Sequence, residues 1–215
     1  MNLQEFKEEF NFKYDAASKG GPDIDDYEMS LMLTQAVKDI TEAAIASYET
    51  EEASKRLIAG LLKYYTSTVT AVTSARKFLE YNVTLPEKLI AILREEPEIE
   101  SCASYPEIVS CRVDEFNSLI NNPFKRPSFR KVLRMEKDKS NITVFSSSKL
   151  KSYKITYIKE IKPIIISTLD SGLSIEGITT VSQTELPNFI HSKIIDIAVM
   201  KTIKTVRSNY INGKQ

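Results

Sequence analysis

The sequence predicts an α+β fold in which N- and C-terminal helices pack as a helical body, with a central antiparallel β meander between them. Two observations predict it. Near both ends, over residues 27–48 and 187–207, apolar residues recur every three or four positions, as in helices that bury one face. In the middle, over 129–158, apolar and polar residues alternate and β-branched and aromatic residues are frequent, as in strands with one buried face.

Three parts of the chain are expected. Residues 1–80 form an N-terminal helical part, 81–182 a β-rich part, and 183–215 a C-terminal helix that completes the helical body. A first helix over 3–14 is expected to end before the glycine and proline residues at 20–22, because these residues interrupt helices.

The long helix over 27–48 should begin at an aspartate. Asp23, Asp25 and Asp26 precede it, and an aspartate side chain can accept the free backbone N–H groups of a first helical turn. A further helix is expected over 51–65. The Thr- and Val-rich segment that follows, 66–73, favours a short strand.

The middle of the chain is harder to assign. The apolar run 89–93 fits either a buried strand or a half-turned helix. The acidic run 95–100, which contains Pro97, is expected to close it as a solvated loop. Prolines disfavour helix at the residues before them, so the double-proline segment 122–127 is predicted to be a stiff, extended strap.

After this strap the meander is predicted to run through three strands. They are expected over 129–136, 142–144 and 153–158, with a hairpin turn at 138–141 between the first two. The last helix then begins near Pro187, a residue that is favoured in a first helical turn.

Composition limits the class of protein. The chain has 215 residues of which 42 % are apolar, enough for a real core in one domain or two small ones. Its formal net charge is zero, so the whole molecule has no overall attraction to nucleic acid or anionic lipid. No apolar run approaches the roughly 18 residues that span a membrane, and we expect no membrane partner. Cys102 and Cys111 suggest neither a disulfide framework nor a metal site, which favours a reducing compartment.

Nothing in the residue pattern predicts catalysis. His191 is the sole histidine, and the partners of a catalytic histidine are not evident around it, so we expect a structural or solvent-facing side chain. The two cysteines lack a neighbouring cation or histidine and are expected to be small buried hydrophobes. The sequence has no glycine-rich phosphate loop and no nucleotide fingerprint. We therefore expect a non-enzyme without catalytic residues, cofactor or metal.

Charge is distributed unevenly. Residues 1–28 hold eight acids and three bases, and residues 125–162 hold twelve bases and three acids. One interpretation is a dipolar molecule that stacks through complementary faces. A second is contact with nucleic acid through the basic region. A third is an ordinary solvated sheet face whose lysines protect exposed strand edges.

The nucleic-acid interpretation has some support in the aromatic residues of the basic region. Phe129, Phe145, Tyr153 and Tyr157 are interleaved with the bases, and such a surface can stack single-stranded bases. Alternation, however, places Tyr153 and Tyr157 on one face with Ile155, which predicts that they pack in a core.

The order of several short motifs resembles the ring proteins of the head–tail neck of crAss-like tailed bacteriophages. The motifs span nearly the whole chain. They are Asn2-Leu3-Gln4-Glu5-Phe6, Asp26-Tyr27-Glu28-Met29-Ser30, Leu33-Thr34-Gln35-Ala36, Thr84-Leu85-Pro86-Glu87, Asn122-Pro123-Phe124-Lys125-Arg126-Pro127, Tyr157-Ile158-Lys159, Lys162-Pro163-Ile164-Ile165 and Glu185-Leu186-Pro187 followed by Ile190-His191.

This resemblance implies a virion structural protein that is assembled in the host bacterial cytoplasm. Such proteins form closed cyclic oligomers, here a dodecamer that would match the portal, and they bridge portal and tail around the DNA channel. Expected partners are therefore further copies of this chain, the portal, neighbouring neck and tail rings, and packaged DNA through non-specific contact at most. The alternative is a phage nucleic-acid-binding module that uses the basic region 125–162. The residues that we expect at a partner interface are Asn122, Pro123, Phe124, Arg126, Pro127, Arg130 and Lys154.

Overall fold

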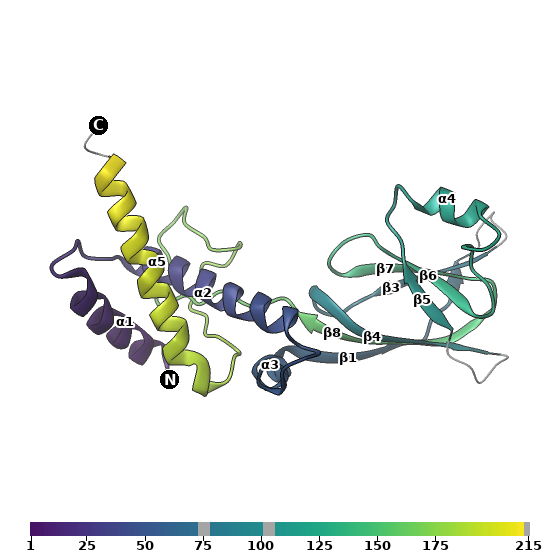
Figure 1. Ribbon diagram of the computed structural model, residues 1–215, viewed down its shortest axis with the longest axis horizontal. Coiled ribbons are helices and arrows are strands. Elements are labelled where there is room, and N and C mark those ends of the chain that lie inside the picture. Colours follow the sequence, from purple (N-terminus) through teal and green to yellow (C-terminus); the bar gives the residue numbers. More distant parts are fainter. Residues whose placement is uncertain (73–77, 101–105, 213–215) are drawn as a thin grey trace. The chain divides into compact units, whose positions relative to one another are not determined.

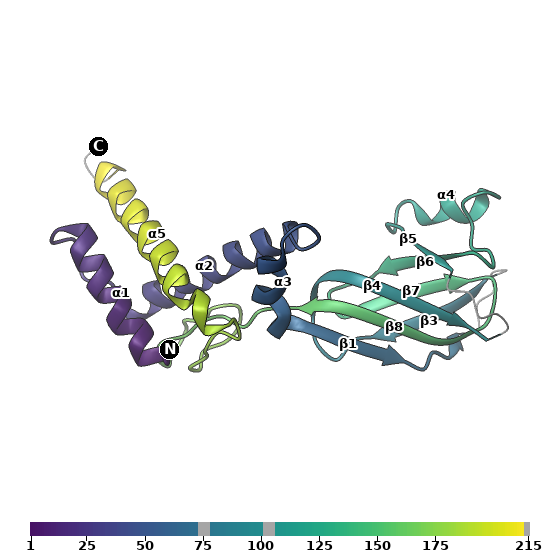
Figure 2. The same ribbon diagram turned by 60° about the horizontal axis from the view of Figure 1, so that its bottom comes forward.

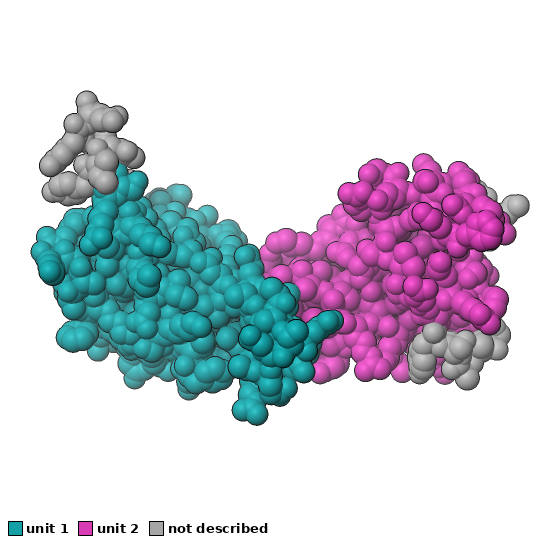
Figure 3. Space-filling view, in the orientation of Figure 1, with its two compact units in different colours: residues 1–61, 161–215 teal, residues 62–160 magenta. Residues whose placement is uncertain are grey.

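The chain folds into two compact units. The structure is a computed structural model, and it describes residues 1–72, 78–100 and 106–212 (Figure 1). Unit 1 consists of residues 1–61 and 161–215, and unit 2 of residues 62–160 (Figure 3). Helices at both ends of the chain and sheets in its middle confirm the predicted α+β class. The three-part division after residues 80 and 182 differs from these two units and stays a prediction.

Unit 1 is mainly helical. Both α1 and α2 pack against α5, so the two ends of the chain form one helical body, as the sequence predicted (Figures 1 and 2). The elements are α1 (Leu3–Ser18), α2 (Asp26–Ala46), α3 (Glu52–Ile58), the 3-10 helices η1 (Ala59–Leu61) and η2 (Asn188–Ile190), and α5 (His191–Asn212).

The ends of the first two helices follow from local side chains. Asn2 and Glu5 form a capping box at the start of α1, in which each side chain accepts the backbone N–H of the other residue. The helix ends at Ser18, and the next residue, Lys19, has a left-handed backbone with a φ of 53°. Asp25 then caps α2 by accepting the Glu28 N–H at 2.7 Å, which confirms the predicted aspartate cap.

The core of unit 1 lies where these helices meet. Phe6, Phe10 and Tyr14 are spaced four residues apart and are all buried on one face of α1. His191 is buried with 1 % of its surface exposed, and its ring centre lies 4.9 Å from that of Phe6. Its Nε2 atom lies 3.0 Å from the Leu186 carbonyl oxygen, so the histidine has a structural environment.

Two hydroxyl groups attach the returning chain to α2. The Thr34 hydroxyl accepts the Ile164 N–H at 3.0 Å and lies 3.3 Å from the Ile164 carbonyl, and Ser30 Oγ accepts the Ile166 N–H at 3.0 Å. These bonds satisfy backbone groups that would otherwise be buried without partners. The segment after Glu160 is therefore held on α2 through Ile164 and Ile166, while Ile165 between them forms a β-bridge with Ser182.

Unit 2 contains two sheets (Figures 1 and 2). One has three strands in the order β1-β8-β4, and the other has five strands in the order β2-β3-β7-β6-β5. All pairings are antiparallel except that of β5 with β6. The strands are β1 (Leu62–Ser67), β2 (Ala71–Val72), β3 (Leu79–Thr84), β4 (Leu89–Ile99), β5 (Glu107–Ser110), β6 (Lys131–Glu136), β7 (Asn141–Ser146) and β8 (Leu150–Lys159).

The main core of unit 2 lies between the two sheets. Tyr153, Ile155 and Tyr157 of β8 belong to one buried cluster with residues of β3 and β7, which confirms their predicted common face. A second cluster covers the other face of the five-stranded sheet, where the short helix α4 (Phe116–Asn121) packs. There the rings of Phe116 and Phe145 have centres 4.3 Å apart.

The predicted strands of the β meander form, but not all of them pair with the neighbours that a meander requires. The β6–β7 hairpin forms, and Asp138 holds its turn by accepting the N–H groups of Ser140 and Asn141 at 2.7 and 2.9 Å. The third predicted strand, β8, instead pairs with β1 and β4 in the other sheet. Cys111 is buried as expected, and Cys102 lies outside the described residues.

Two predictions were wrong in ways that matter for unit 2. The helix expected over 51–65 ends at Ile58, and the chain continues as β1 from Leu62 because Tyr65 contributes to the sheet core. The acidic run 95–100 was expected to be a loop, yet β4 continues through it to Ile99. Because β4 is an edge strand, it pairs with a neighbour on one side only. Proline, which has no backbone N–H to donate, is tolerated in such a strand, and Pro97 lies there.

Candidate partner interface

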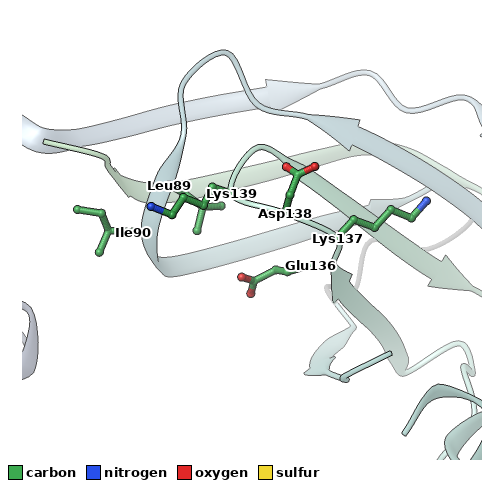
Figure 4. A pocket seen from close by; sticks show the side chains of 6 residues that line it. All are labelled: Leu89, Ile90, Glu136, Lys137, Asp138 and Lys139. Atoms are coloured by element: carbon green, nitrogen blue, oxygen red, sulfur yellow. The ribbon is translucent and has the colours of Figure 1, made fainter. Parts of the chain in front are cut away.

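The described residues offer little that resembles a reaction centre. No group of three His, Cys, Asp or Glu side chains in ranges 1–72, 78–100 and 106–212 is arranged to hold a metal ion. One hollow of about 380 Å³ lies between the start of β4 and the β6–β7 turn (Figure 4). Its four charged lining residues are engaged elsewhere. Asp138 holds the hairpin turn, and Glu136, Lys137 and Lys139 pair with Arg134, Glu80 and Glu160. Across the helices of the described part, none is long and apolar enough to cross a membrane.

The predicted proline strap is a tight turn, so the expectation of an extended segment was wrong. Asn122 itself is extended, as a residue before proline should be, with φ −85° and ψ 116°. Its carbonyl then accepts the N–H groups of Lys125 and Arg126 at 3.1 and 2.9 Å, and its side chain accepts the Phe124 N–H at 2.9 Å. Asparagine followed by proline is favoured at the first two positions of a turn, and this signal was present in the sequence.

This turn and the residues that follow it expose two aromatic side chains to solvent. Phe124 is 88 % exposed and Phe129 is 62 % exposed, while Pro127 between them is buried and anchors the segment. The Arg130 guanidinium lies 5.1 Å from the centre of the Phe129 ring, within the range of a cation–π contact. We call residues 122–131 the cationic loop.

The acidic strands of unit 2 neutralise much of the basic region. Six of its bases pair with carboxylates that lie in or near β3 and β4 or just after β8, which explains why an acidic run is built into a strand. The pairs are Arg134 with Glu95, Lys137 with Glu80, Lys139 with Glu160, Lys149 with Glu100, Lys151 with Glu98 and Lys159 with Glu87.

The bases of the cationic loop, in contrast, have no carboxylate partner among the described residues. Lys125, Arg126, Arg130 and Lys131 make no ion pair within 4 Å in the described part of the chain, although Lys131 Nζ lies 3.5 Å from the Phe124 carbonyl oxygen. The nearby carboxylate of Glu115 is already bound by Arg112 at 2.6 Å. Four unpaired cations and two exposed phenyl rings therefore lie within ten residues.

Six of the seven predicted interface residues lie in this loop, because they are close in sequence. Lys154 is the exception. It belongs to β8 in the three-stranded sheet, and it alternates with the inward-facing Tyr153 and Ile155. The loop instead joins α4 to β6 of the five-stranded sheet. The structure therefore does not bring Lys154 together with the other six, and an interface role for all seven remains a prediction.

The nucleic-acid alternative loses most of its stacking surface. Phe145, Tyr153 and Tyr157 are each at most 3 % exposed, so only Phe129 of the four aromatic residues considered for base stacking is accessible. Sequence reasoning did not select Phe129, Lys125 or Lys131 as interface residues. Which bases find an ion-pair partner depends on which strands are neighbours, and apart from the β6–β7 hairpin that pairing was not evident in the sequence.

A buried carboxylate links the two sheets of unit 2. Glu95 of β4 accepts hydrogen bonds from the Arg134 guanidinium of β6, at 2.5 Å, and from the Tyr153 hydroxyl of β8. The side chains of Glu95 and Arg134 are only 9 % and 12 % exposed. Burial raises the pKa of Glu95 from 4.5 to about 7, and the Arg134 charge opposes that rise.

We expect this carboxyl group to make stability depend on pH. Between its unfolded pKa near 4.5 and its folded pKa of about 7, the folded protein keeps a proton that the unfolded chain has released. The free energy of unfolding should therefore fall as pH rises through this window, by up to about 1.4 kcal/mol per pH unit. Urea unfolding at pH 5, 6, 7 and 8 measures the slope.

Glu95→Gln is the control for that slope, since glutamine does not titrate. Burial lowers the pKa of His191, which gives an opposite slope in both proteins, so the difference between native protein and variant isolates Glu95. The native protein should lose stability relative to the variant as pH rises from 5 to 8. Parallel pH profiles would show that Glu95 does not titrate in this range.

The two units and the exposed loop together define a class of protein. An exposed loop that combines unpaired cations with two phenyl rings is typical of a component that acts through macromolecular contacts. Comparison with known proteins agrees. The family described as phage tail ring protein 3/4 matches residues 1–212, and the chain belongs to this family.

Two curated relatives come from Bacteroides phage crAss001. Ring protein 4/5 of that phage is 29 % identical over 223 residues, which cover 93 % of this chain and 91 % of the relative. Ring protein 3 is 28 % identical over 196 residues, which cover 84 % of this chain and 85 % of the relative. These matches confirm the resemblance to crAss-like ring proteins and identify the chain as a phage ring structural protein.

Proposed function

We propose that this ring protein forms a closed cyclic oligomer in the head–tail neck of a crAss-like phage. There it bridges the portal and the tail and surrounds the DNA channel. The observation that carries the proposal is the family match over residues 1–212, because it includes both units and not only one of them. As a virion component it would be assembled in the host cytoplasm, and its role would be structural, not catalytic.

The charges of the two units support a ring. Unit 1 carries 17 acids and 12 bases, and unit 2 carries 12 acids and 17 bases, so their formal charges are −5 and +5. A ring that closes by rotation needs two different faces on each copy, one of which meets the other on the next copy. Faces of opposite charge speed such association and disfavour the wrong order.

In this proposal the portal sets the number of copies in the ring. A dodecamer would match the symmetry expected of the portal, and the same contacts would repeat around the axis. Packaged DNA would pass through the ring with non-specific contact at most. Neighbouring neck and tail rings would cover the other faces of the ring.

Purified virions and reconstituted complexes test this function. We expect quantitative mass spectrometry of virions to find this chain in a fixed ratio to the portal protein, one to one for a dodecamer. Purified chain mixed with portal should also give a ring-shaped density below the portal in cryo-electron microscopy. Absence from virions, or normal joining of tails to heads in phage that lack the gene, would contradict the connector role.

A further inference from the structure

The contact between neighbouring copies in the ring can be assigned to particular residues. We propose that the cationic loop of one copy docks on the acidic surface of unit 1 of the next copy, near the connection between α1 and α2. This inference rests on the proposed ring assembly, and it adds the surfaces through which that ring would close.

The loop has the chemistry of an interface and lacks a partner among the described residues. Its four cations are unpaired, and two phenyl rings are 88 % and 62 % exposed. Aromatic and arginine side chains are the residue types that most often dominate binding energy at protein interfaces. Burying Phe124 against a partner would remove an apolar ring from water, which favours a protein partner over a bare phosphate backbone.

A second copy is the partner that the charges favour. Unit 1 has a formal charge of −5, and part of that charge is exposed where α1 leads into α2. Asp15, Asp23 and Glu28 are exposed there and form no ion pair in the described ranges. Burial, and then the charges of Asp15, Glu28 and Asp23, raise the pKa of the Tyr14 hydroxyl at the end of α1.

The acids outnumber the bases at this connection. Lys19 is the one exposed base of residues 15–28, and Asp26 is already paired with Lys7 at 2.8 Å. Asp25 is occupied by its capping bond to the Glu28 N–H. Three carboxylates therefore remain available to the loop of another copy, and every copy carries both halves of the contact, as a heterologous ring requires.

Two charge-reversal variants test the pairing. The loop variant carries Arg126→Glu and Arg130→Glu. The patch variant carries Asp15→Lys and Asp23→Lys, and it spares the capping residue Asp25. Assembly of the full-length protein on the portal is measured by native mass spectrometry and by sedimentation, each variant alone and both mixed in equal amounts.

Each variant alone should assemble at least about tenfold more weakly than the native protein, because like charges then face each other at every contact. The equal mixture should assemble again. In an alternating ring, the acidic loop of one variant meets the basic patch of the other, and the native loop of the second meets the native patch of the first. Rescue by mixing is expected only if the contact joins different copies.

A matched control carries Lys88→Glu and Lys149→Glu. These lysines also belong to unit 2, are 65 % and 75 % exposed, and have ion pairs of only 3.9 and 3.8 Å. The control should assemble like the native protein. Unchanged far-ultraviolet circular dichroism and unchanged thermal unfolding in all variants would show that assembly, not folding, was altered.

The outcomes separate the inference from the proposed function. If the loop and patch variants assemble on the portal like the native protein, the docking contact is wrong and the ring function stands. Normal assembly of a loop variant that has lost salt-sensitive DNA binding would assign the loop to DNA and also overturn the contact. If even the native protein fails to assemble on the portal, the ring function and this inference both fall.

Discussion

At pH 8, where the Glu95 carboxyl is ionised, replacing Arg134 with alanine should lower the free energy of unfolding of the protein by about 3–5 kcal/mol, the usual effect of removing one partner of a buried ion pair. The guanidinium joins Glu95 across the two sheets, and both side chains are at most 12 % exposed. Without it, the Glu95 carboxylate would retain only the Tyr153 hydroxyl as a described partner. Urea unfolding followed by far-ultraviolet circular dichroism measures the loss.

Arg94→Ala is the matched control for that change. Arg94 pairs with Glu96 on the same strand as Glu95, but its side chain is 74 % exposed. Exposed ion pairs contribute about 0–1 kcal/mol, so this variant should differ little from the native protein. Equal losses for the two arginines would rule out a special role for the buried pair. The double variant Arg134→Met with Glu95→Leu should recover most of the stability, because it removes both buried charges together.

Replacing Phe6 with alanine should destabilise the helical body by about 3–5 kcal/mol, the range for deleting a fully buried phenyl ring. Phe6 is 0 % exposed, and its ring lies against His191 at the start of α5. The cavity would form where α1 contacts α5, so the attachment of the first helix should weaken most. Urea unfolding measures the total loss, and hydrogen exchange of the α1 amides locates it.

Phe12→Ala controls for helix composition in that experiment. Phe12 lies on the same helix but is 75 % exposed, and a change there should shift stability by no more than about 0.5 kcal/mol. A large effect at Phe12 together with a small one at Phe6 would mean that the α1 face that packs on α5 has been assigned wrongly.

The helices of unit 1 were predictable because their signals are local. The apolar positions of α2 repeat with the helical period, and Asp25 precedes them as a cap. The hairpin between β6 and β7 was predictable for the same reason, since Asp138 and Asn141 form its turn within four residues. In each case the interacting groups are neighbours in sequence.

The interface role of the seven residues stays a prediction, and only their position in the fold can be compared with the sequence. Six of the seven lie in one loop, so choosing a contiguous segment brought them together without knowledge of the fold. The loop conformation was misjudged, because the extended preference of Asn122 before proline was applied to the whole segment and the turn preference of Asn-Pro was not. Lys154 was selected for its charge alone, and charge does not reveal which sheet a strand joins.

The amino-acid order settles the helical periods, the caps, the turns and the uneven distribution of charge along the chain, since each depends on residues a few positions apart. Only the tertiary structure determines which charged side chains remain without an ion-pair partner. Glu95 looked like part of a solvated loop until β4 placed it beside Arg134. The bases between Lys131 and Lys159 looked available until acids in or near β3 and β4 paired with five of the eight. Coulomb attraction and burial act through distances in space, and strands far apart in sequence become neighbours only when the sheets form.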